Sequence, residues 1–298
     1  LLIFNDNVVD GYRKTRHLEH LIDKKMTKCF RVCALSYNKI YRRGYLMHYE
    51  HHRYVGKVCV VTGAANGLGL NLVNRLVEEG ALVGALDLEQ DTLDKEFGDK
   101  KDKVFAVPCD VSSKANVDAA IAAVIEHFGH IDALFNIAGV IGRQSLLDST
   151  EEQWRKVIDI NLNGTFFVSQ AVLRHMVDKG IKGVVVNTSS VASLIVSPNT
   201  GAYSASKGGV TMFTKFAALE MAKYGIRVCA FGPGTHATRL TEGTRLNPER
   251  CEMFLRNIPM GRFGEPDEAT SVALFLGSDE ASYCTGQTWI EDGGNSLF

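Results

Sequence analysis

From residue 57 onward, short apolar runs alternate with longer segments whose apolar residues recur at helical spacing. Between residues 117 and 128, one set of apolar residues falls at offsets 0, 3, 4, 7, 8 and 11 and so shares one face of a helix: Val117, Ala120, Ile121, Val124, Ile125 and Phe128. The short runs are predicted strands, and they cover residues 58–62, 81–87, 104–110, 131–139, 183–190, 226–232 and 287–294.

These predicted strands are almost continuously apolar, and a helix-length segment separates each from the next. Such strands pair in parallel and are covered by helices on both faces of the sheet. The pattern therefore predicts one doubly wound α/β domain with about seven strands. Ligands of this architecture bind beyond the carboxyl ends of the strands, which is where the polar residues of the sequence gather.

The charge distribution marks a boundary near Gly56. Residues 1–56 hold 11 Lys or Arg and 5 Asp or Glu, whereas the remaining residues hold 22 and 29. We therefore separate an N-terminal extension, residues 1–52, from the α/β domain, residues 53–298. Three interpretations of the extension stay open: a disordered segment, an artefact of where the chain starts, or a targeting signal.

The stretch 24–49 contains seven Lys or Arg and no acid, as mitochondrial presequences do. The expected location is therefore the cytoplasm, or the mitochondrion if residues 26–56 act as a presequence.

The composition argues against several classes of protein. The formal net charge of the whole chain is −1, whereas general nucleic-acid binders and anionic-membrane binders carry a basic excess. No apolar run approaches the roughly 18 residues of a membrane span. The seven cysteines are scattered without a CxxC pair, so neither a disulfide framework nor a metal site is predicted.

A glycine-rich turn follows the first predicted strand in the sequence TGAANGLG, residues 62–69. Glycines let the backbone approach a pyrophosphate, and the N-terminus of the following helix attracts its negative charge. Asp87 ends the second predicted strand, where a carboxylate can accept hydrogen bonds from a ribose diol. Turn formation and helix capping are the structural alternatives for these two features, but together they favour a dinucleotide site.

A second group of polar residues carries candidate chemistry. Tyr203 and Lys207 are four residues apart in a predicted helix and share one face. Ser190 ends a predicted strand, and Asn161 lies within an earlier predicted helix. Each has an ordinary structural explanation on its own, so only the ordered set is informative.

With these motifs in order, the chain from about Val55 to Asn295 resembles the short-chain dehydrogenase/reductase family, in its short, single-domain branch. The resemblance implies a Rossmann-type fold, a nicotinamide cofactor and the interconversion of a secondary alcohol and a ketone. Family members of this kind form homodimers or homotetramers. The motifs that carry the resemblance are TGAANGLG, Asp87, CDV (109–111), NIAG (136–139), Asn161, Ser190, YSASK (203–207), GPG (232–234) and GQTWIEDGG.

The resemblance also implies site residues. Asn161, Ser190, Tyr203 and Lys207 match the catalytic tetrad. Asp110 and Val111 match contacts at the adenine edge, and the segment 136–139 matches the turn beside the cofactor. The expected cofactor contacts are Gly63, Asn66, Gly67, Leu68, Gly69, Asp87, Asp110, Val111, Asn136, Ala138, Gly139, Tyr203, Lys207, Pro233, Gly234 and Thr238.

Two residues depart from the family pattern. Ile137 stands where a second Asn is common, which removes a structural hydrogen bond. His236 lies in the loop after GPG, at a position that varies widely in the family, so no role is assigned to it.

The roles agree with the chemistry. Tyrosine ordinarily titrates near ~10, so a neighbouring ammonium and the cationic nicotinamide are expected to favour the phenolate of Tyr203 as acid/base. Asp87 favours NAD over NADP because it would repel a 2′-phosphate. Two alternatives are a catalytically weak dinucleotide-binding regulatory protein of the same fold and a sugar-nucleotide epimerase. The complete tetrad argues against the first, and the glycine spacing and the end of the chain soon after DGG argue against the second.

Overall fold

The computed structural model describes residues 52–238 and 241–297, in two units. The larger unit, called the body below, runs through residue 243 and resumes at residue 255. Residues 244–254 belong to the other unit and contain most of helix α10 (Pro248–Arg256) and the end of α9 (Glu242–Arg245). The predicted extension lies outside the described residues except for His52, so its interpretation and the expected location stay predictions.

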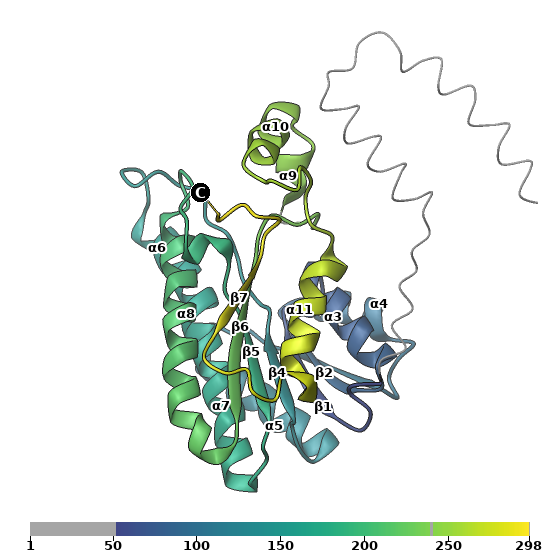
Figure 1. The fold of residues 1–298 in the computed structure, drawn as a ribbon. Helices are drawn as coiled ribbons and strands as arrows, with labels where there is room; N and C mark the ends of the chain where they lie inside the picture. Colours follow the sequence, from purple (N-terminus) through teal and green to yellow (C-terminus); the bar gives the residue numbers. More distant parts are fainter. Residues whose placement is uncertain (1–51, 239–240, 298) are drawn as a thin grey trace, which may run out of the picture. The chain divides into compact units, whose positions relative to one another are not determined.

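The body is built on a seven-stranded sheet in the order β3-β2-β1-β4-β5-β6-β7, with every pair parallel. This confirms the predicted fold class (Figure 1). The strands are β1 (Val58–Thr62), β2 (Leu82–Asp87), β3 (Val104–Pro108), β4 (Ala133–Asn136), β5 (Val184–Thr188), β6 (Arg227–Pro233) and β7 (Thr288–Glu291).

Helices cover both faces of this sheet. In Figure 1, α3, α4 and α11 lie on one side of the sheet and α5, α7 and α8 on the other. Their bounds are α3 (Gly67–Glu78), α4 (Gln90–Phe97), α5 (Lys114–Phe128), α6 (Glu151–Ile158), α7 (Gly164–Lys179), α8 (Gly201–Met221) and α11 (Pro266–Gly277). Shorter turns are the π-helix η2 (Asp159–Asn163) and the 3-10 helices η3 (Val191–Ser193), η4 (Ala222–Tyr224) and η6 (Asp279–Ala281).

The hydrophobic core consists of two layers, one on each face of the sheet. Alternate side chains of each strand pack into one layer or the other. In β1, Cys59 and Val61 pack into the layer with α3 and α11, whereas Val60 packs into the layer with α5 and α7. Successive side chains of a strand point to opposite faces, so a strand covered on both sides must be apolar throughout. This requirement explains why the strands were recognisable as continuous apolar runs.

The sheet register brings the polar strand ends together. Thr62 at the end of β1 pairs with Asn136 at the end of β4 and with Leu86 near the end of β2. The Thr62 hydroxyl accepts hydrogen bonds from the backbone N–H groups of Ile137 and Ala138, both at 3.1 Å. The turns after β1 and β4 are thereby joined side by side at the carboxyl edge.

Within the described residues, no helix is long and apolar enough to cross a membrane.

Candidate active site

A cavity of about 730 Å³ lies at the carboxyl ends of the strands, as the predicted fold required. Most of the site residues expected from the sequence line it: Gly63, Asn66, Gly67, Leu68, Gly69, Asp87, Asp110, Val111, Ala138, Gly139, Tyr203, Lys207, Pro233, Gly234 and Thr238. The other three, Asn136, Asn161 and Ser190, are not part of its lining and are buried beside it.

The glycine-rich turn forms one wall of the cavity and has no room for side chains. Gly63 has φ +66°, and a Cβ there would lie 2.8 Å from the Cα of Ala138. A Cβ on Gly69 would lie 1.9 Å from the carbonyl oxygen of Gly63. The turn thus brings the start of α3 directly against the end of β1, and the N-terminus of α3 faces the cavity. This arrangement suits a pyrophosphate group.

Two carboxylates stand next along the wall. Asp87 at the end of β2 accepts hydrogen bonds from the backbone N–H groups of Ala65, at 3.0 Å, and Glu89, at 3.2 Å. A carboxylate has about four acceptor sites, so Asp87 keeps capacity for a ligand hydroxyl. Asp110 accepts from the backbone and hydroxyl of Ser112, at 2.9 and 2.7 Å, and these bonds hold the turn after β3.

Tyr203 and Lys207 both reach the cavity from α8. The Lys207 side chain is buried, and its ammonium donates to the carbonyl oxygen of Thr188 at 2.7 Å. Its Nζ lies 5.7 Å from the centre of the Tyr203 ring. Burial lowers the pKa of Lys207 to about 8. The ammonium is therefore charged at neutral pH but close to losing its proton.

Ser190 and Tyr203 come together where β5 and α8 meet. Burial raises the pKa of Tyr203, and a hydrogen bond with Ser190 offsets part of that rise. The Ser190 hydroxyl also accepts from the backbone N–H of Ala192 at 3.1 Å, which caps η3. The surrounding protein thus favours the phenol form of Tyr203, and Lys207 does not lower its pKa as the sequence led us to expect.

Asn161 occupies a helical segment of unusual geometry. It lies in η2, a π-helical turn between α6 and α7, rather than in the regular helix that the sequence predicted. Its side chain accepts from the backbone N–H of Val140 at 2.8 Å and donates to the carbonyl of Val140 at 2.9 Å and to Ser206 at 3.0 Å. The amide therefore ties the turn after β4 to α8, and these contacts are structural.

Asn136 shows the effect of the Ile137 departure. Its amide nitrogen donates to Ser169 and to Asn187, both at 2.9 Å. Its buried side-chain oxygen has no hydrogen-bond partner among the described residues. Ile137 has no side-chain polar group that could serve this acceptor, and the structural hydrogen bond that the family pattern implies at position 137 stays a prediction.

Sequence reasoning missed some of the lining, and His236 is the main example. Its side chain is buried, borders the cavity and is paired with Glu291. The only signal in the sequence was its place between Gly234 and Thr238. The cavity is also lined by Thr188, Cys109 and Thr241. Thr188 ends β5 and Cys109 directly follows β3, and this position at a strand end could have identified both.

Comparison with known proteins agrees with this geometry. Residues 63–296 match the family model described as enoyl-(acyl carrier protein) reductase. The 3-oxoacyl-[acyl-carrier-protein] reductase FabG of Thermotoga maritima is 41% identical over 245 residues, which are 81% of this chain and 98% of the relative. Glucose 1-dehydrogenase 2 of Bacillus subtilis is 38% identical, over 82% of this chain and 96% of the relative. Among solved structures, a levodione reductase superposes with a TM-score of 0.78 at 35% identity, covering 82% of this chain and 99% of that one.

The chain therefore belongs to the short-chain dehydrogenase/reductase family. It is an NAD(P)-dependent oxidoreductase that acts on alcohols and ketones. The cavity fits such a cofactor, because the closely packed glycines leave room for a pyrophosphate and Asp87 offers acceptors for a ribose.

Proposed function

We propose that this protein is an NAD-preferring dehydrogenase/reductase of secondary alcohols and ketones, with Tyr203 as its general acid/base. The observation that carries the proposal is the shared cavity. Tyr203 and Lys207 on α8 open into the same 730 Å³ space as the glycine-rich turn and Asp87. The residue proposed to transfer the proton, Tyr203, and the residues proposed to bind the dinucleotide therefore line the same cavity.

The proposed reaction needs a proton transfer beside a hydride transfer. The bound nicotinamide cofactor supplies or accepts the hydride. In the oxidation direction, Tyr203 takes the alcohol proton at its phenolic oxygen; in reduction it returns that proton to the carbonyl oxygen. Ser190 orients the same oxygen by a hydrogen bond, which keeps the reacting atoms aligned.

Lys207 has two proposed tasks. Its ammonium favours the phenolate of Tyr203 by charge, and it donates to the ribose of the cofactor. The structure holds Nζ on the carbonyl of Thr188, which fixes the direction of the side chain before any ligand arrives. Asn161 serves next to this group by holding the turn after β4 against α8; we also propose that it holds the water that links Lys207 to solvent.

The preference for NAD is supported by the charges around the cavity. Among the described residues that line it, the acids are Asp87, Glu89 and Asp110, whereas Lys207 is the single Lys or Arg. Lys207 comes from α8, and the described residues of the lining offer no further Lys or Arg that could neutralise a phosphate beside Asp87. A 2′-phosphate next to Asp87 would therefore meet negative charge without a neutralising cation.

The relatives named above act, by their names, on an acyl thioester of a carrier protein, on glucose and on levodione. Their common feature is a carbon–oxygen centre that is oxidised or reduced, which supports a secondary alcohol or ketone as the substrate class here. The test is a spectrophotometric panel of secondary alcohols and ketones with NAD and NADP in both directions. Turnover of at least one pair that disappears in Tyr203→Phe supports the proposal; turnover that is equal in the variant contradicts it.

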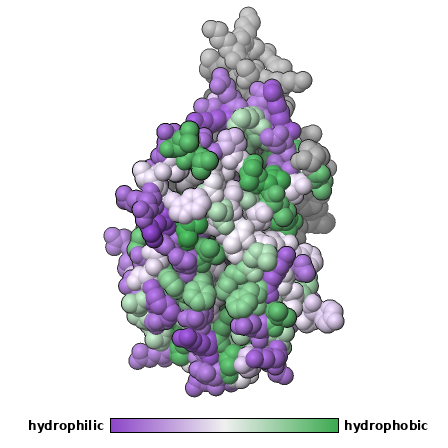
Figure 2. Space-filling view, turned by 90° about the vertical axis from the view of Figure 1, so that its left-hand side faces the viewer, coloured by the Kyte–Doolittle hydropathy of each residue, from purple (hydrophilic) through white to green (hydrophobic). Residues whose placement is uncertain are grey.

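We also propose that the protein forms a homodimer or homotetramer through α7 and α8. Figure 2 shows apolar groups gathered on the side of the body that carries these helices. The exposed apolar side chains of α8 are Met212, Phe216 and Leu219, which are 61%, 55% and 81% exposed. Together with Phe166 of α7, they leave a helix face that a second copy of the chain would cover.

A further inference from the structure

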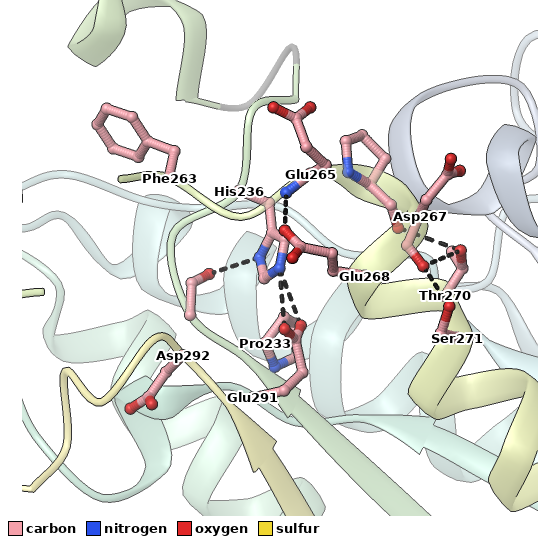
Figure 3. A network of polar contacts seen from close by, with 12 residues as sticks. Pro233, His236, Phe263, Glu265, Asp267, Glu268, Thr270, Ser271, Glu291 and Asp292 are labelled. Carbon is pink, nitrogen blue, oxygen red and sulfur yellow. Dashed lines mark hydrogen bonds and ion pairs between the residues drawn. The ribbon is translucent and has the colours of Figure 1, made fainter. Parts of the chain in front are cut away.

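His236 is a buried histidine whose two ring nitrogens both face acceptors (Figure 3). Its Nε2 lies 2.9 Å from Oε1 and 3.1 Å from Oε2 of Glu291, at the end of β7. Its Nδ1 lies 3.3 Å from the carbonyl oxygen of Gly234. The side chain is only 4% exposed, so these protein groups are its main partners.

This geometry specifies the protonation state. Neither a carboxylate nor a carbonyl oxygen can donate a hydrogen bond, so each ring nitrogen must carry a hydrogen to bond its partner. A neutral imidazole has only one N–H and would leave one acceptor facing a lone pair. The surroundings therefore fit a doubly protonated, cationic His236.

The neighbouring charges support this conclusion. Burial by itself would lower the pKa of His236, but the hydrogen bond and charge of Glu291, with a smaller effect of Glu268 on α11, raise it above the ordinary value. Glu268 is itself paired with Arg262, with two contacts of 2.7 Å. Asp292 lines the same small pocket as His236, and its carboxylate accepts from the backbone N–H groups of Gly294 and Ser296.

His236 lies in the middle of the segment 234–238, whose backbone is hydrogen-bonded to two other parts of the chain. The backbone N–H of Gly234 donates to the carbonyl of Glu291 at 2.9 Å. Thr235 and Ala237 exchange backbone hydrogen bonds with Gly264 at 3.0 and 2.8 Å. A Cβ on Gly264 would lie 2.4 Å from Nε2 of His236, so the imidazole fills the space that the glycine leaves.

We propose that His236 is a positioning residue: in its cationic form it ties residues 234–238 to Glu291 and so holds the wall of the cofactor cavity in its binding shape. The inference rests on the proposed function and on the expectation that Gly234 and Thr238, which line the cavity, contact the cofactor. Loss of the second ring proton removes the positive charge that pairs with Glu291 and one of the two N–H donors, and so loosens the segment. Cofactor affinity therefore falls as pH rises through the titration of His236.

A first experiment needs no cofactor. The ring signals of the full-length protein labelled with ¹³C,¹⁵N-histidine are followed by NMR as a function of pH, and His236 is assigned by its absence from His236→Gln. We expect a midpoint above the ordinary histidine value of about 6.5 and a lower midpoint in Glu291→Gln. A midpoint at or below the ordinary value overturns the proposal.

A second experiment measures the Kd of NAD⁺ by calorimetry at pH values below and above that midpoint. In the unchanged protein we expect the Kd to rise by about five- to tenfold, a modest coupling between two sites. In His236→Gln, the Kd should already be weaker at the lower pH and should change less between the two pH values than in the unchanged protein, because only the contribution of Lys207 remains. His130→Gln is the matched control, because His130 also pairs with an acid, Asp132 at 3.0 Å, but precedes β4 and so lies at the amino end of the strands, away from the cavity.

The outcomes separate the two proposals. If the unchanged protein binds no dinucleotide at any pH, the proposed function fails. If it binds NAD⁺ and His236→Gln shows the same pH dependence and affinity, only the positioning role of His236 fails. Lys207 is present in all these proteins, so its own titration cancels in the comparison. If His236→Gln does not fold, Glu291→Gln is measured in its place. The positioning role is then also overturned if the Kd of NAD⁺ for Glu291→Gln changes with pH as it does for the unchanged protein.

Discussion

Asp87 at the end of β2 accepts a hydrogen bond from the backbone N–H of Ala65, 3.0 Å away in the glycine-rich turn. The carboxylate thus has a fixed position at the edge of the cavity before any ligand binds. A fixed charge repels a 2′-phosphate more effectively than a mobile one, since it cannot turn away without losing its own contact.

We therefore expect catalytic efficiency with NAD to exceed that with NADP by at least about tenfold, on the order of 1.4 kcal/mol. Asp87→Ser should reduce this ratio severalfold because it removes the charge while keeping a short polar side chain. Glu89→Gln, which removes a charge from an exposed residue of the same cavity wall, is the control and should change the ratio less. Steady-state kinetics with both cofactors measure the ratio, and equal efficiencies in the unchanged protein would refute the assignment.

Lys207 should be a source of instability in the protein without cofactor. Its pKa is about 8 in the fold and 10.5 ordinarily, so between these values the folded state binds fewer protons than the unfolded state. Its contribution to stability therefore rises with pH across that window. Lys207→Met, which removes the buried charge, should stabilise the protein by up to about 3 kcal/mol near pH 7.

The advantage of Lys207→Met should shrink by about half or more near pH 9.5, because the unchanged protein then folds with a neutral lysine. Urea unfolding at the two pH values checks this, with turnover measured in parallel. A stability difference that is independent of pH would show that the buried charge of Lys207 does not destabilise the folded state.

The exposed apolar face of α8 predicts an oligomer. Light scattering at micromolar concentration should give a mass of at least two chains. Phe216→Glu should dissociate the oligomer because it places a charge in the contact, whereas Leu147→Glu, at a residue 94% exposed outside this face, should leave the mass unchanged. A monomer mass for the unchanged protein contradicts the prediction.

Much of the fold could be predicted from the sequence because both faces of the sheet are buried. The run 58–62 became β1 with the same bounds, and Val117, Ala120, Ile121 and Val124 are the buried residues of α5. Strand ends were less accurate. The segment 131–139 forms a strand only over Ala133–Asn136, since the chain turns towards Thr62 directly after Asn136.

The site residues could be predicted where they directly follow a strand or recur at helical spacing. The glycine-rich turn and Asp87 follow successive strands, and the carboxyl ends of parallel strands meet at one edge. The spacing of Tyr203 and Lys207 placed both on the same helix face. The local pattern did not reveal η2, whose Asn161 side chain contacts Val140 and Ser206, both distant in sequence.

His236 shows the same limitation more clearly. Its partner Glu291 is 55 residues further along the chain, and Gly264 comes from a third segment. No local pattern links these residues. Their relationship appears only when β6 and β7 pair and bring Pro233 opposite Glu291.

The central claim is that Tyr203 transfers the proton, and Tyr203→Phe tests it most directly. The variant removes one oxygen and keeps the ring beside the cavity, so the Kd of NAD⁺ should stay within about twofold, well below 1 kcal/mol. Turnover of the best substrate from the panel should fall by about 10³–10⁴-fold, the upper end for general acid–base catalysis. A variant that keeps a third or more of the turnover, with unchanged cofactor affinity, would show that another group carries the proton.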